Sequence, residues 1–139
     1  MKPTVSPFLT FNGQAKEAMD FYAQTIPNTQ VIRAMTYGEL NPETPQNATD
    51  LIMQGAFAVA GTEILCLDMV PDYAAPDFAW SNSLLVRFNH EADFHACHNG
   101  LAEGGSVMMG PEKVGDITLC SWVVDKYGVV WQPVLDFAF

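Results

Sequence analysis

The stretch that decides the fold covers residues 8–22 and reads FLTFNGQAKEAMDFY. Its first four residues suit a strand, and Asn12-Gly13 then gives a turn signal. From Gln14 onward the apolar residues recur at helical spacing, with charged residues on the opposite side. We therefore predict a strand over 5–11 and a helix over 14–26, with Asn12 as a candidate N-cap. The apolar stripe of this helix consists of Ala15, Ala18, Met19, Tyr22 and Ile26.

Outward from this stretch, the first half continues with three strands. Residues 29–37 predict a strand and residues 38–49 a polar loop. Two further strands are predicted over 50–60 and 62–69, with Ala60-Gly61 at their turn. Residues 70–80, with two prolines and two aspartates, have the composition of a linker.

The second half repeats the order strand, helix and three strands. Phe11-Asn12 lies 77 positions before Phe88-Asn89, and each pair stands at a change from strand to helix. Gly61 lies 67 positions before Gly128, and each precedes the last strand of its half. The sequence therefore predicts two βαβββ modules. The predicted elements of the second are strands over 82–88, 106–109, 118–124 and 129–135, with a helix over 91–102.

Composition excludes several classes of function. The chain has 139 residues, of which 49% are hydrophobic and 16% charged, so it can bury a core rather than remain disordered. Its net charge of −10, with only 6 Lys and Arg, excludes a basic face for nucleic acid and disfavours an anionic membrane surface. The N-terminus lacks the apolar run of a signal peptide, so we expect a soluble, cytoplasmic protein. We expect Cys66, Cys97 and Cys120 to be buried reduced thiols.

Two segments carry a resemblance to a known family. Residues 8–22 and residues 119–133, which read LCSWVVDKYGVVWQP, resemble the PhnB-like (3-demethylubiquinone-9 3-methyltransferase-like) branch of the vicinal oxygen chelate superfamily. That superfamily includes glyoxalase I, extradiol dioxygenases and bleomycin-resistance proteins. The resemblance implies an α+β fold in which two tandem βαβββ modules form curved mixed sheets around a cleft, and it implies a homodimer. The single domain would cover 1–139, with modules 5–69 and 81–137 joined by the linker 70–80.

The same resemblance allows a test for a metal. Metal-dependent members of the superfamily hold one divalent ion with a His or Glu from the first and last strand of each half. The corresponding positions are Ser6 or Pro7, Leu65, Ser83 or Leu84, and Gln132. Proline and leucine cannot bind a metal, and neutral hydroxyl and amide oxygens bind weakly. We therefore expect no metal at the usual site and no other cofactor.

Other clusters are weaker candidates. His90, His95 and His98 could form a different metal site, but Phe94, Cys97 and Leu101 form the core stripe of that helix, so His98 should flank the core. The role of the three histidines stays open. Asp68, Asp72 and Asp77 are expected to form a solvated acidic loop. A single glycine after the first strand argues against binding S-adenosylmethionine for methyl transfer.

The informative candidates are aromatic, amide and hydroxyl side chains. If Gln132 corresponds to a metal-ligand position of the superfamily, its side chain should point into the cleft. Strand alternation then turns Trp131 the other way, into the core. Arg33 could anchor an anionic ligand because a guanidinium suits that geometry, and Tyr37 could border the mouth of the cleft. Our predicted ligand-binding residues are Gln132, Ser83, Ser6, Tyr37, Arg33 and Trp122.

These observations favour a metal-independent protein that binds a small organic molecule in the cleft between the sheets. Two alternatives stay open. One is a metal-dependent enzyme of the glyoxalase or dioxygenase type that recruits its ion through unmapped residues. The other is a dimeric interaction module whose cleft is vestigial.

Overall fold

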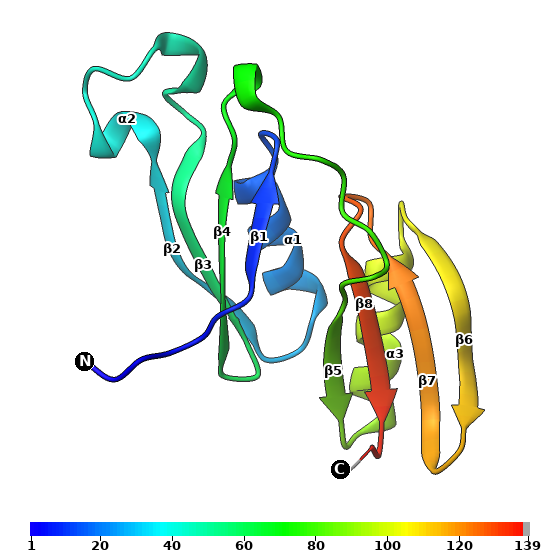
Figure 1. Ribbon diagram of the computed structural model, residues 1–139. Helices are drawn as coiled ribbons and strands as arrows, with labels where there is room; N and C mark the ends of the chain where they lie inside the picture. Colours follow the sequence, from blue (N-terminus) through cyan, green and yellow to red (C-terminus); the bar gives the residue numbers. More distant parts are fainter. Residues whose placement is uncertain (138–139) are drawn as a thin grey trace. The chain divides into compact units, whose positions relative to one another are not determined.

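The computed structural model describes residues 1–137 and divides the chain into two compact units. One unit takes Met1–Gln24 and Asn28–Pro76, and the other takes Thr25–Pro27 and the chain from Asp77 onward. Each unit contains one four-stranded mixed sheet (Figure 1). Within residues 1–137 no helix is both long and apolar enough to cross a membrane.

The sheet of the first unit has the strand order β1-β4-β3-β2, in which β1 runs parallel to β4 and the other pairs are antiparallel. A long helix, α1, covers one of its faces (Figure 1). The elements are β1 (Phe8–Phe11), α1 (Ala15–Thr25), β2 (Thr29–Thr36), the short α2 (Tyr37–Leu40), β3 (Ile52–Val59) and β4 (Thr62–Asp68).

The core of this unit lies between α1 and the sheet. The buried side of α1 is the predicted apolar stripe, and the Tyr22 ring lies 5.3 Å from that of Phe57 on β3. Gly55 allows close packing here, because a Cβ at this position would stand 2.6 Å from the Sγ of Cys66. Burial raises the pKa of the Cys66 thiol to about 12, with a further contribution from Asp68, so the buried thiol stays protonated.

The second unit repeats this arrangement with the strand order β5-β8-β7-β6, in which β5 runs parallel to β8. Its helix α3 buries Phe94, Cys97, His98 and Leu101. The indole of Trp131 is fully buried, as predicted. The elements are β5 (Leu84–Phe88), α3 (Glu91–Ala102), β6 (Ser106–Val114), β7 (Ile117–Val124) and β8 (Val130–Leu135).

The strand registers confirm the internal repeat. Phe8 lies opposite Leu65 in the first sheet, and Leu85 lies opposite Gln132 in the second. Leu85 follows Phe8 by 77 positions and Gln132 follows Leu65 by 67, which are the offsets found in the sequence. The prediction of two βαβββ modules with mixed sheets is therefore confirmed.

Several predicted boundaries are wrong. β6 runs to Val114 instead of ending at residue 109, because it keeps pairing with β7 across register shifts. β1 begins at Phe8 instead of residue 5, which leaves Ser6 before the strand. The loop predicted over 38–49 contains most of α2, which begins with a capping box between Thr36 and Glu39.

The prediction for the acidic loop is wrong at one residue. Asp72 and Asp77 are exposed, but Asp68 is buried at the end of β4. Its carboxylate accepts hydrogen bonds from the backbone N–H groups of Gly13, Ala15 and Ile52, each at 2.9 Å. Asp68 therefore fixes the start of α1 and the start of β3.

Asn12 is not the helix cap that its position predicted. Its side chain donates to the carbonyl oxygen of Ala75 at 3.0 Å and accepts from the N–H of the same residue at 2.8 Å. Asn12 thus ties the turn before α1 to the chain that follows β4. The N–H of Ala15, which an N-cap at Asn12 could bind, donates to Asp68 instead.

Candidate functional site

One face of the second sheet is covered by α3. The opposite face carries the alternate residues of each strand and is called the open face because α3 does not cover it, although Val134 and Cys120 on its two central strands are buried. Strand pairing places Leu85 beside Gln132. The register of β7 and β8, with Val123 opposite Trp131, places Trp122 opposite Gln132. A row of the open face therefore consists of Leu85, Gln132, Trp122 and Met109, from β5, β8, β7 and β6 in turn.

The structure brings Ser83 and Gln132 together. The Nε2 of Gln132 donates a hydrogen bond of 2.6 Å to the Oγ of Ser83, and the pair is partly buried. These are two of the positions at which the resemblance places metal ligands. The bond leaves the Gln132 amide oxygen and the Ser83 hydroxyl proton for a further partner. The pair can therefore both accept from and donate to a molecule lying on the open face.

An aromatic pair stands beside these polar groups. The ring of Trp122 meets that of Trp80 edge to face, with centroids 6.1 Å apart and planes at 63°. Trp80 lies just before β5, in a turn closed by a bond from the Asn82 N–H to the Ala79 carbonyl oxygen. The composition of residues 70–80 predicted a linker, so Trp80 was not among the predicted ligand-binding residues. The signal was its position three residues before Ser83, which carries it to the same edge of the sheet.

The next row of the open face carries opposite charges at its two ends. Arg87 on β5, Val134 on β8, Cys120 on β7 and Glu112 on β6 are neighbours in turn. The guanidinium of Arg87 lies 5.8 Å from the ring centroid of Phe137. Burial raises the pKa of the Cys120 thiol, and the charge of Glu112 raises it further. Cys120 is thus a neutral thiol rather than a nucleophile.

The other three predicted site residues lie in the first unit. The Tyr37 hydroxyl donates to the backbone oxygen of Asp68 at 2.8 Å, and burial raises its pKa. Arg33 donates from Nε to the Oε1 of Gln54 at 3.0 Å. Ser6 precedes β1. The six candidates thus fall into two sets of three, one in each unit, and only Ser83, Gln132 and Trp122 form a compact group.

Of the three histidines of the second unit, only His98 is buried. His98 is buried on the side facing away from the open face, and its Nδ1 lies 2.9 Å from the Oγ of Ser121. Its ring stacks on Phe94, with planes 5° apart. Burial lowers the pKa of His98, and nearby His95 lowers it further. Across residues 1–137 no three His, Cys, Asp or Glu side chains gather as a metal site would need.

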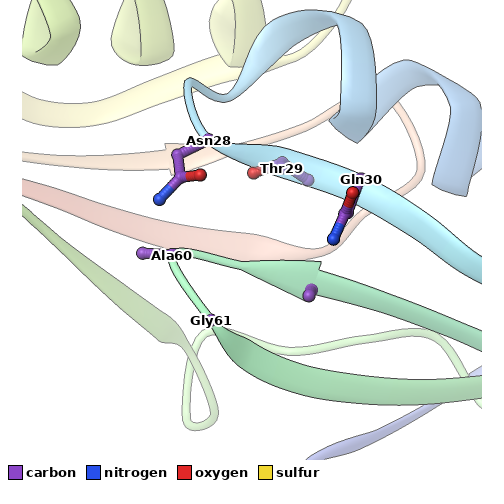
Figure 2. A pocket seen from close by; sticks show the side chains of 6 residues that line it. Asn28, Thr29, Gln30, Ala60 and Gly61 are labelled. Carbon is purple, nitrogen blue, oxygen red and sulfur yellow. The ribbon is translucent and has the colours of Figure 1, made fainter.

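A shallow pocket of about 440 Å³ lies in the first unit, beside the turn between β3 and β4. Figure 2 shows the amide side chains of Asn28 and Gln30 near Ala60 and Gly61. Its lining combines these amides and Thr29 with small residues and contains no charged group. Because most of the lining is solvent-exposed, the pocket offers little desolvated surface to a ligand.

Two βαβββ units with matching registers define the fold of the vicinal oxygen chelate proteins. The chain belongs to the 3-demethylubiquinone-9 3-methyltransferase family, the PhnB-like branch of that superfamily, whose family model matches residues 3–134. The resemblance seen in the sequence is therefore confirmed. No curated protein matches the chain.

Solved structures agree with this assignment. A PhnB protein from Bacillus cereus is 27% identical with a TM-score of 0.80, covering 96% of this chain and 99% of its own. A protein from Pseudomonas aeruginosa is 26% identical with a TM-score of 0.84, covering 96% of this chain and 98% of its own. A fosfomycin resistance protein from Listeria monocytogenes is 12% identical with a TM-score of 0.63, covering 100% and 95%, and shares the fold alone.

Proposed function

We propose that this protein binds a small organic molecule on the open face of the second sheet and does so without a metal at the mapped position. The observation that carries the proposal is the hydrogen bond between Gln132 and Ser83, beside the ring of Trp122. Small-molecule sites combine apolar walls with a few placed polar groups, and this group has that composition.

The donor chemistry supports binding without a metal. A divalent ion in this fold would draw its ligands from positions that hold Ser83 and Gln132 in the second unit. Both side chains are neutral, and a short hydrogen bond already joins the Gln132 Nε2 to the Ser83 Oγ. A metal would have to break that bond and accept two weak oxygen ligands in return. An organic molecule that donates to the amide oxygen of Gln132 leaves the bond in place.

We do not propose methyl transfer, although the name of the family refers to it. Binding of S-adenosylmethionine usually uses a parallel sheet with a glycine-rich turn after its first strand. Here the first strand is followed by Asn12-Gly13-Gln14, and both sheets are mixed. Asp68 already occupies the amides at the start of α1, where such a turn would bind its ligand.

The test is a screen of small organic molecules by isothermal titration calorimetry, repeated on matched variants. We expect Gln132→Ala to weaken binding of a hit roughly fivefold to tenfold, the effect of one buried hydrogen bond. Gln54→Ala is the control, because Gln54 also bonds a neighbouring side chain but on the first sheet. A hit that Gln132→Ala and Trp122→Ala leave unchanged would contradict the proposed location.

A second arm of the test concerns the metal. The protein is purified without a chelator or histidine tag and challenged with nickel, zinc, manganese and iron. We expect no tightly held ion and no thermal stabilisation. A stoichiometric ion whose binding depends on His90, His95 or His98 would overturn the metal-free proposal and favour the enzymatic alternative.

The proposal includes a cytoplasmic homodimer. Cys66, Cys97 and Cys120 are all free and buried, which agrees with a reducing compartment. The molar mass of the protein, measured by light scattering as it elutes from a size-exclusion column, tests whether it is a dimer. If side chains fill the space on the open face and no molecule from the screen binds, the dimeric interaction module would be favoured instead.

A further inference from the structure

Trp80 and Trp122 leave aromatic surface on the open face. Trp80 is 63% exposed, which is unusual for the largest apolar side chain. Its ring meets that of Trp122 edge to face, and such a contact covers at most one face of one of the two rings. A planar molecule placed between these rings and the Gln132–Ser83 pair would cover this exposed surface.

The charges around Trp122 are not symmetric. Glu112 pairs with Cys120 on the neighbouring strand, whereas Arg87 lies two strands away in the same row. With strands about 4.8 Å apart and alternate residues about 6.6 Å apart, Glu112 is about 8 Å from Trp122 and Arg87 about 12 Å, between Cα positions. Arg87 also has an aromatic partner in Phe137. The net charge of −10 adds a field that attracts cations.

Aromatic faces and a nearby carboxylate favour the same ligand chemistry. The face of an indole ring attracts a cation more strongly than any other side-chain ring does. We propose that the molecule bound on this open face is a planar aromatic organic cation, stacked on Trp80 and Trp122 with its positive end toward Glu112. This inference rests on the proposed function and names its ligand class.

The experiment uses three probes of similar shape and different charge. They are N-methylquinolinium, quinoline, which is neutral at pH 7, and the anion quinoline-2-carboxylate. Binding is followed by calorimetry and by the indole N–H signals in NMR spectra of the full chain. Trp131 is an internal control, because its N–H is buried and bonded to Asp125 at 3.0 Å.

We expect the cation to bind roughly fivefold more tightly than the neutral probe, the scale of a cation–π contact, and the anion to bind least. The signals of Trp80 and Trp122 should move and that of Trp131 should not. Glu112→Gln should weaken the cation roughly twofold to fivefold, an effect that added salt reduces. The control is Glu63→Gln, on the exposed end of β4 in the first unit.

The outcomes separate this inference from the proposed function. If quinoline or its carboxylate binds as tightly as the cation while Trp122 and Gln132 respond, the charge assignment is wrong and the binding face stands. If a screening hit binds through Gln132 without shifting the Trp80 signal, and binds the Trp80→Ala variant with the same affinity, the aromatic stacking is wrong. If no probe and no screened molecule moves Trp122 or depends on Gln132, both proposals fail.

Discussion

The two modules have the same topology and register but differ at one matched position on the open face. In the first module Leu65 of β4 lies beside Phe8, whereas in the second Gln132 of β8 lies beside Leu85 and bonds Ser83. Ser6 corresponds to Ser83 at the offset of 77, but its partner strand presents a leucine. The fold is therefore built equally well with an apolar residue here. The polar pair of the second module is not required by the architecture, which is why we propose that it serves binding.

Each module also buries one aspartate, at different places. Asp68 closes β4 and accepts three backbone N–H groups. Asp125 follows β7 and accepts the N–H groups of Tyr127 and Val129 through Oδ1 and the indole N–H of Trp131 through Oδ2. The first module thus uses its carboxylate to fix a helix start, and the second uses it to hold a turn and its largest core side chain.

The largest effect should come from the core of the second module. Trp131→Ala removes a fully buried indole and leaves Asp125 without one of its donors, so we expect a loss of about 3–5 kcal/mol in the free energy of unfolding. Trp122→Ala, on the open face of the neighbouring strand β7, should lose less than about 1.5 kcal/mol. Urea unfolding measures both. Equal losses would mean that the two faces are not assigned correctly.

The two aspartates give the next comparison. Asp68→Asn and Asp125→Asn keep the size of the side chain but replace one accepting oxygen with a donor that faces a buried N–H. Each should lower the stability by about 1–3 kcal/mol, measured by urea unfolding. Asp72→Asn is the exposed control and should change the stability by less than about 0.5 kcal/mol. If Asp68→Asn leaves the free energy of unfolding unchanged, the three hydrogen bonds of Asp68 do not hold the start of α1.

The second module should also carry a pH dependence through His98. Burial lowers the pKa of His98 below its ordinary 6.5, so the unfolded chain binds the proton more readily. The contribution of neutral His98 to the free energy of unfolding is therefore fully present above pH 6.5. It decreases as the pH falls from 6.5 toward the lower pKa of His98 in the folded state. Unfolding measured at pH 8, 6.5 and 5 should show this slope. His98→Asn should flatten the slope, and an unchanged slope in this variant would contradict the assignment to His98.

The smallest effect tests the matched position itself. Gln132→Leu gives the second module the residue that the first has at Leu65, and it should change the stability by less than about 0.5 kcal/mol. The same variant should weaken the binding of a molecule that hydrogen-bonds the amide roughly fivefold to tenfold, as Gln132→Ala should. A large loss of stability would instead show that the Gln132–Ser83 bond is structural.

Much of the fold could be predicted because periodicity and turn residues act locally. The helix predicted over 91–102 matches α3 to the residue, and the apolar stripe of α1 is buried as expected. The missed features depend on contacts between distant residues. Asp68 follows an apolar strand and precedes a proline-containing segment, and nothing nearby shows that three amides from residues 13, 15 and 52 will surround it.

The candidate site was only partly predictable for the same reason. Gln132, Ser83 and Trp122 could be mapped because two strands and a resemblance fixed their register. Trp80 and Glu112 could not be placed beside them. Trp80 belongs to no strand, and the predicted end of β6 at residue 109 left Glu112 outside the sheet.

The distribution of tryptophan has a practical consequence. The chain has 3 tryptophans, and Trp80, Trp122 and Trp131 all belong to the second unit. Intrinsic indole emission therefore reports on that half of the chain alone, while circular dichroism follows both halves. Denaturation curves from the two signals will coincide only if the halves unfold together. The duplicated chain thus contains its own optical test of whether its two copies behave as one cooperative structure.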